Sequence, residues 1–391
     1  MALLFKNAHV IHSDRIEPGC DLRVSGSHIV AVASGLKPER DDEVIDLSGQ
    51  YLSPGFIDIH IHGAMGRDTM EATPEAFQAI CQHHASGGTT ALLLTTICAK
   101  TGDLTNVLRV ARSYREATHD GAALLGIHLE GPYFSPAKPG AHATSLLREP
   151  SPSHYAPLLE YKDVLKQMTL APELPGALEL IDTLRSNGIR VSGGHSDAWD
   201  DQACTAFVHG MEGVTHTFNC MSSARRRGVY RVAGLLEFAM SEPGILCELI
   251  ADGHHVSPTL MKMLYLAKGA DGICLVTDAT SGAGLADGSE FRLGEIDCVV
   301  RDGVALTADG ESLAGSTADM SRLVRTMVEH VQVSLVEAVR MATLVPAKAL
   351  QLERKGVLAA GADADLVVLD QSLQVQATYV EGRKVYQRNR V

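Results

Sequence analysis

Short runs of apolar residues alternate along most of this chain with longer stretches in which apolar residues recur at helical spacing. The runs have the length and composition of buried strands, and this alternation predicts βα units around a parallel sheet. Eight such runs predict an α/β fold, a TIM-like (β/α)8 barrel. The predicted strands are residues 55–62, 88–97, 123–130, 167–172, 189–195, 213–217, 245–251 and 272–278.

Helix start and stop signals lie between these runs. Thr73 precedes Pro74 as a cap residue precedes the first turn of a helix. Further helices are predicted over residues 176–187, 196–209 and 257–268, and Gly188 and Gly269 end the first and the last of these.

The two ends of the chain show a different pattern, with short alternating strands separated by turns. Neither end has enough apolar residues for a core of its own, so we expect the two to pair. The sequence therefore predicts a small β-sandwich domain built from residues 1–53 and 356–391, beside a barrel formed by residues 54–355.

Two histidines end the first predicted barrel strand. Side chains at positions i and i+2 of a strand point to the same face, so His60 and His62 project together from an otherwise apolar run. Functional residues of such barrels lie at the carboxyl ends of the strands. Metal-competent side chains follow four other predicted strands: Glu130, His195, His216 and Asp278.

Imidazole and carboxylate donors together suit a borderline divalent cation such as Zn²⁺ or Fe²⁺. A single histidine or aspartate after a strand is more often a helix cap or a loop residue. Six metal-competent groups on one rim favour a metal site instead. The absence of clustered cysteines argues against a purely structural zinc site.

Composition narrows the function classes. The chain has 391 residues, 45% hydrophobic and 21% charged, as in a globular protein with a large core. Its net charge of −13 argues against nucleic-acid binding, and its one dense basic cluster, Arg225–Arg227, suits a small anionic ligand better. The eight cysteines form no Cys-x-x-Cys pair, so we expect reduced core thiols. We expect a cytoplasmic protein without a membrane span, because no apolar run approaches roughly 18 residues.

Several motifs together resemble a known family. The chain is similar to the metal hydrolases of the amidohydrolase superfamily and, among them, to the N-acetylglucosamine-6-phosphate deacetylases. Pro54–Gly63 marks the superfamily only. His128–Pro132, which contains Glu130, and the Asp-Gly-His-His-Val segment Asp252–Val256 are specific to the deacetylases. The motifs are Pro54–Gly63, His128–Pro132, Gly194–Ser196, Thr215–Asn219, Ala251–Val256, Leu275–Thr280 and Leu313–Ser316.

The resemblance implies a metal-dependent hydrolase that converts N-acetyl-D-glucosamine 6-phosphate to D-glucosamine 6-phosphate and acetate. It implies that Glu130, His195 and His216 bind the main metal ion and that Asp278 is the catalytic acid and base. The metal expected is zinc, with iron, cobalt, manganese or cadmium as alternatives.

The resemblance also implies a substrate site and a partner. His142 is similar in place to a family residue that contacts the substrate carbonyl. Family members are homodimers in which an arginine reaches the neighbouring subunit's site. Here the family's Arg-Glu-Pro-Gly is replaced by Arg225-Arg226-Arg227-Gly228-Val229, so which arginine binds phosphate stays open. The substrate-binding residues implied are Ala141, His142, Asn219, Cys220, Arg227, His255, Leu313, Ala314 and Gly315.

The number of metal ions also stays open. Some family members replace the paired histidines and hold one ion, whereas this chain keeps His60 and His62. A second ion held by these two with Glu130 and Asp278 is permitted. No lysine ends the fourth predicted strand, so Glu130 is the expected bridge between the ions.

Three rival functions remain. Deacetylation of the galactosamine epimer would use the same site. A ring deaminase or cyclic amidase is disfavoured by Glu130 and the Asp252–Val256 segment. A catalytically silent scaffold is disfavoured because every expected ligand is present.

Overall fold

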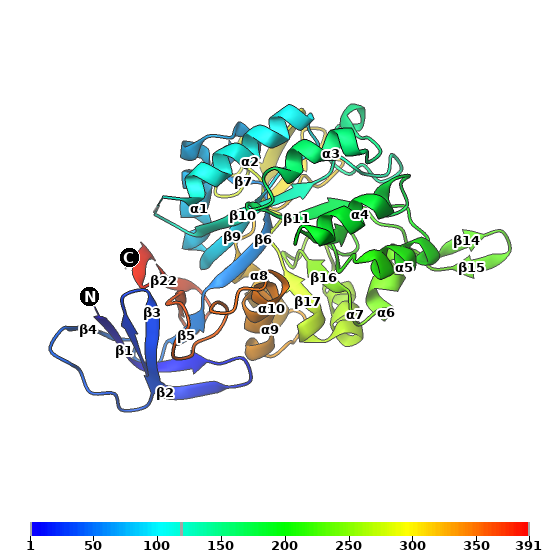
Figure 1. Cartoon of the computed structure of the whole chain (residues 1–391). Coiled ribbons are helices and arrows are strands. Elements are labelled where there is room, and N and C mark those ends of the chain that lie inside the picture. Colours follow the sequence, from blue (N-terminus) through cyan, green and yellow to red (C-terminus); the bar gives the residue numbers. More distant parts are fainter. Residues whose placement is uncertain (1, 118–119, 390–391) are drawn as a thin grey trace.

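The chain folds around a nearly closed barrel of parallel strands, seen in a computed structural model that describes residues 2–117 and 120–389 (Figure 1). Neighbouring barrel strands pair in parallel around the ring, and Ile61 forms an isolated bridge to Ala279 where the first and last strands meet. This confirms the α/β barrel that the apolar runs predict. The barrel strands are β6 (Phe56–Ile61), β9 (Thr89–Thr95), β10 (Ala123–Glu130), β11 (Leu165–Leu170), β12 (Arg190–Gly193), β13 (Gly213–Val214), β16 (Leu246–Leu249) and β17 (Ile273–Leu275).

Helices pack around the outside of this barrel (Figure 1). Thr73 caps α1, since its side chain accepts a hydrogen bond from the Ala76 N–H at 3.2 Å, as the sequence predicts. The helices are α1 (Pro74–Ser86), α2 (Thr101–Arg115), α3 (Pro152–Leu159), α4 (Ala177–Ser186), α5 (Asp200–His209), α6 (Leu235–Ser241), α7 (Pro258–Lys268), α8 (Met320–Glu329), α9 (Leu335–Ala342) and α10 (Leu344–Ala349), with 3₁₀ turns at Thr69–Glu71, Thr144–Leu146 and Ala270–Gly272.

One helix begins later than the sequence predicts. The expected helix over 196–209 starts at Asp200. The preceding backbone is held in an extended form, because Ser196 bridges to Met221 and Trp199 bridges to Gly234. These tertiary hydrogen bonds override the local helical preference.

Strands from both ends of the chain share one sheet, and the two termini lie near each other in Figure 1. The central strand β5 pairs with β1 on one side and with β21 on the other, so the strands form one continuous sheet rather than two separate ones. The division of the chain near residues 53 and 356 remains our proposal. The strands are β1 (Ala2–Ile11), β2 (Ile16–Ser25), β3 (His28–Ala33), β4 (Asp42–Asp46), β5 (Tyr51–Pro54), β21 (Leu366–Leu369), β22 (Val375–Val380) and β23 (Arg383–Gln387).

Three small strand groups lie outside these two sheets. The sheet of β18 (Glu290–Leu293), β19 (Ile296–Arg301) and β20 (Val304–Thr307) has an apolar cluster of its own. The hairpin of β14 (Arg225–Arg227) and β15 (Tyr230–Val232) projects from the barrel (Figure 1). The third group is the short pair β7 (Gly63–Ala64) and β8 (Arg67–Asp68). None of these groups was predicted from the sequence.

The cysteines are free thiols, and six of the eight are buried. Among the described residues, no helix has the length and apolar character needed to cross a membrane.

Candidate metal centre and active site

The candidate ligands converge at the mouth of the barrel, where the strands end. Glu130 is the last residue of β10, while His195, His216 and Asp278 follow β12, β13 and β17. These three have φ angles of 47°, 32° and 48°, in the left-handed region that residues other than glycine seldom adopt. Such backbone is typical of functional sites, because it turns a side chain out of the strand direction.

Glu130, His195 and His216 form one buried group of donors. The Nε2 atoms of the two histidines lie 3.0 Å apart. Glu130 Oε1 lies 3.3 Å from Nε2 of His195 and 3.1 Å from Nε2 of His216. The sequence-predicted main ligands are therefore together, although they come from three strands.

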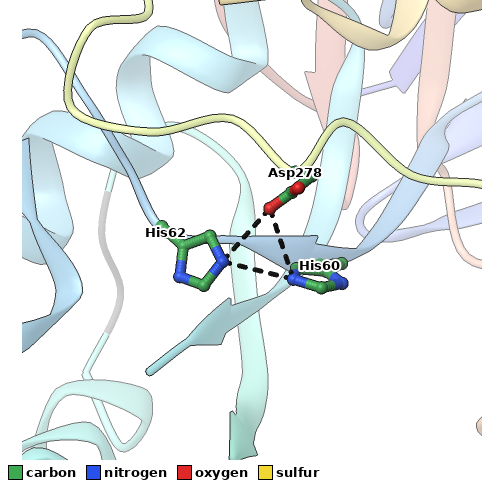
Figure 2. A group of neighbouring side chains, drawn as sticks. All are labelled: His60, His62 and Asp278. Carbon is green, nitrogen blue, oxygen red and sulfur yellow. Dashed lines mark hydrogen bonds and ion pairs between the residues drawn. The ribbon is translucent and has the colours of Figure 1, made fainter. Parts of the chain in front are cut away.

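His60, His62 and Asp278 form a second buried group (Figure 2). The Nε2 atoms of the two histidines are 3.2 Å apart. Asp278 Oδ1 lies 3.4 Å from Nε2 of His60 and 3.1 Å from Nε2 of His62. Glu130 Oε2 lies 3.2 Å from His62 Nε2. Glu130 thus offers one carboxylate oxygen to each group.

Both groups fit a divalent cation. Donors bound tetrahedrally to zinc at about 2.0–2.1 Å lie about 3.3 Å from one another. The spacings within each group are close to this value. Imidazole nitrogens that face each other at 3.0 Å and 3.2 Å carry lone pairs toward a common point, which a cation between them would stabilise.

Buried charges reinforce this arrangement. Burial alone would raise the pKa of Glu130, but the charge of His60 and the nearby rings of His142, His195 and His216 hold that pKa well below its usual range. Burial would likewise raise the pKa of Asp278, which His60, His62 and His216 hold far below its usual range. Both carboxylates are therefore ionised and suited to a cation.

The histidines differ in charge preference. Burial lowers the pKa of His195 to about 4, against the opposing effect of the Glu130 carboxylate, so this ring is neutral as a metal ligand must be. Burial also lowers the pKa of His62, but Asp278 and Glu130 outweigh it and raise the value to about 9. A bound cation would take the place of the proton held there.

A cavity of about 350 Å³ opens above the two groups, within the size range of small-molecule sites. His60 does not line it, because this side chain is fully buried. Ala314 is also fully buried, beside Leu313 and Gly315. The sequence-predicted residues that do line the cavity are His62, Glu130, Ala141, His142, His195, His216, Asn219, Cys220, His255, Asp278, Leu313 and Gly315.

Two lining histidines are oriented by fixed partners. The backbone N–H of Cys98 donates to Nδ1 of His142 at 3.3 Å, so the ring proton of His142 is on Nε2. Asp252 Oδ2 accepts from Nδ1 of His255 at 2.8 Å. His142 therefore presents a donor to the cavity, and His255 is held in place by a carboxylate.

Arg227 is not brought to this cavity. It is exposed on the β14–β15 hairpin and pairs with Asp201 at 3.1 Å. Arg225 pairs with Asp197 at 2.9 Å and stacks on Trp199. None of the three arginines is among the cavity-lining residues of the described chain.

The sequence analysis missed other residues around the site. Ile97, Leu293 and Ile296 line the cavity, the last two from the small sheet of β18–β20. The alternation of Phe291 and Leu293 with charged residues was a strand signal. Glu248 lies below the metal groups, and its signal was a charged residue inside an apolar run.

Comparison with known proteins identifies the family. The model of the Amidohydrolase family matches residues 51–385. The chain belongs to the amidohydrolase family. It is a hydrolase, and its two donor groups suit the divalent metal on which such hydrolases depend. This membership confirms the resemblance read from the motifs.

The sequences of two relatives match most or nearly all of this amidohydrolase. It is 33% identical over 386 residues to an N-acetylglucosamine-6-phosphate deacetylase of Vibrio furnissii, covering 98% of this chain and 94% of the relative. It is 35% identical to an N-acetylgalactosamine-6-phosphate deacetylase of Escherichia coli O157:H7, covering 87% of this chain and 89% of the relative.

A solved structure is also similar. It is a mutant N-acetyl-D-glucosamine-6-phosphate deacetylase of Mycobacterium smegmatis in complex with N-acetyl-D-glucosamine-6-phosphate. The match has a TM-score of 0.91 and 33% identity, and covers 99% of this chain and 100% of the other.

Proposed function

We propose that this amidohydrolase removes the N-acetyl group of N-acetyl-D-glucosamine 6-phosphate, giving D-glucosamine 6-phosphate and acetate. The observation that carries the proposal is the shared carboxylate of Glu130. Its two oxygens face two separate donor groups at the floor of one cavity, with Asp278 beside them. Relatives that match nearly the whole chain are deacetylases of this kind.

The proposed ligands are Glu130, His195 and His216 for a first cation, and His60, His62, Glu130 and Asp278 for a second. We propose zinc, with iron, cobalt, manganese or cadmium as alternatives, because nitrogen and oxygen donors at these spacings suit it. When bound, the cation lowers the pKa of a water molecule and polarises the amide carbonyl.

The reaction then needs proton transfers, which we assign to Asp278. Its ionised carboxylate accepts a proton from the attacking water. The same group passes that proton to the amine nitrogen, so that the C–N bond breaks with a neutral leaving amine. His142 donates from Nε2 to the carbonyl oxygen, where negative charge develops.

The other end of the substrate requires polar donors for phosphate. His255, Asn219 and Cys220 line the cavity and are proposed to contact the sugar phosphate. Asp252 would keep His255 aimed at it.

Arg227 is proposed to act from a second copy of the chain. Its hairpin is exposed, with Val229 and Tyr230 at 85% and 74%, as expected of residues that are covered in a dimer. We therefore propose that the chain forms a homodimer. We also propose that it works in the cytoplasm. Light scattering tests the dimer, and a monomeric active enzyme would exclude it.

The substrate is tested by comparing acetate release from three compounds at equal metal loading. We expect turnover of N-acetylglucosamine 6-phosphate at a kcat/KM at least about 30-fold above that of the unphosphorylated sugar, since one lost charged contact costs roughly 2–5 kcal/mol. Equal rates on these two would remove the phosphate site. The third compound, N-acetylgalactosamine 6-phosphate, addresses the second candidate function, which the Escherichia coli relative supports; faster turnover of it would replace the glucosamine assignment.

A further inference from the structure

A buried carboxylate supports the metal groups from inside the barrel. Glu248 lies on β16 within an apolar strand and is 1% exposed. One of its oxygens lies 3.2 Å from Nδ1 of His60, and the other accepts from Nε2 of Gln167 at 2.7 Å. Both oxygens are therefore occupied as acceptors.

This contact fixes the direction of one hydrogen bond. A carboxylate only accepts, so Nδ1 of His60 must carry the proton that it donates to Glu248. When a cation displaces the second ring proton, the lone pair is then on Nε2, which faces Nε2 of His62 at 3.2 Å and Oδ1 of Asp278 at 3.4 Å. His60 is thus held as the tautomer that can bind a cation.

Within the described part of the chain, no carboxylate is bonded to Nδ1 of the other histidine ligands. Nδ1 of His195 contacts only a backbone carbonyl, that of Lys138, at 3.0 Å. Nδ1 of His62 and of His216 have no hydrogen-bond partner within residues 2–117 and 120–389. In the His60, His62 and Asp278 group, Glu248 is therefore the one group that fixes a ligand's tautomer.

We propose that Glu248 is a positioning residue that prepares His60 for the second cation and so decides whether this enzyme holds one metal or two. Gln167, fully buried on β11, holds Glu248 in turn. The inference rests on the metal site of the proposed function but adds a residue that does not touch the cation.

The variant Glu248→Gln tests it, because it keeps the shape and changes the hydrogen bonds. If Gln167 keeps its acceptor, the new amide nitrogen faces His60 and donates to Nδ1, which moves the ring proton to Nε2. In the alternative arrangement, the side-chain amide of Gln167 flips. Its buried amide nitrogen then lies where Oε1 of Gln167 lies now, a position without a hydrogen-bond partner in the described chain. The first arrangement is therefore favoured. With the ring proton on Nε2, His60 has no lone pair there to bind the second cation.

The double variant Glu248→Gln with Gln167→Glu restores the hydrogen bond that Nδ1 of His60 donates to position 248. The carboxylate at position 167 accepts from the amide nitrogen at position 248, so the amide oxygen again accepts from His60. Asp252→Asn is the matched control, since it makes the same change in a buried carboxylate bonded to Nδ1 of His255, outside the donor groups.

The experiment titrates the metal-free full chain with Zn²⁺ against a competing chelator and counts bound ions by mass spectrometry. In parallel, ¹⁵N NMR of the imidazoles shows which ring nitrogens of His60 carry a proton with and without metal. We expect two ions in the original enzyme. Glu248→Gln should weaken one site about 10–100-fold and leave the other unchanged. The double variant should recover the second ion, and Asp252→Asn should bind two.

Unchanged binding of both ions in Glu248→Gln would overturn the proposal. Equal loss at both sites, or no recovery in the double variant, would also overturn it, since either would mean a general structural effect. A single ion in the original enzyme at excess Zn²⁺ would overturn it while leaving the deacetylase proposal intact. Absence of any bound ion would instead contradict the proposed function itself.

Discussion

Glu130→Gln is expected to empty both metal sites and to lower kcat/KM by about 10³-fold or more. Each oxygen of Glu130 faces a different donor group, at 3.1 Å from His216 and 3.2 Å from His62. A neutral amide offers only one oxygen and no charge, so one group loses its oxygen donor and the other keeps only an uncharged one. The cation contributes several kcal/mol to the transition state, and about 1.4 kcal/mol corresponds to tenfold in rate.

Metal analysis and steady-state kinetics on the purified variant check this expectation. Glu290→Gln, the same change at an exposed position, is the control and should keep both metal and activity. Because Glu130 is buried, circular dichroism is needed to show that the variant is folded. A folded Glu130→Gln protein that retains its metal and its rate would remove Glu130 as the shared ligand.

Asp278→Asn is expected to lower kcat by about 10²–10⁴-fold with little change in KM. The amide has nearly the shape of the carboxylate but cannot carry a proton from water to the leaving amine. The group of Glu130, His195 and His216 does not include Asp278, so at least one metal ion should stay bound.

Pre-steady-state and steady-state acetate release, together with metal content, separate these effects. A loss confined to KM would mean that Asp278 binds substrate rather than moving protons. A nearly normal kcat would remove it from the reaction altogether. Loss of all bound metal would assign Asp278 a role in the first site that its geometry does not indicate.

Much of the barrel could be predicted because each strand is a continuous apolar run. The observed strands β6, β9 and β10 lie within the predicted ranges, each shorter by no more than a few residues. The ends of the barrel strands were less predictable. The strand expected over 213–217 stops at Val214, since the backbone then turns to the left-handed conformation at His216.

The candidate site was predictable as a set of residues but not as an arrangement. Parallel strand ends must share one rim, so Glu130, His195 and His216 were expected near one another. Which oxygen of Glu130 serves which group depends on tertiary packing that no local pattern contains. Glu248 was overlooked because a single charge inside an apolar strand shows its partner, His60, only once the barrel closes.

We propose above all that this chain deacetylates an amino-sugar phosphate by means of a metal held at the rim of the barrel. The most direct measurement is acetate release from N-acetylglucosamine 6-phosphate by the purified chain, first freed of metal with a chelator and then reloaded with Zn²⁺. We expect no detectable release from the metal-free protein and recovery in proportion to the ions bound per chain. Undiminished release without metal, or none from the fully loaded enzyme, would contradict it.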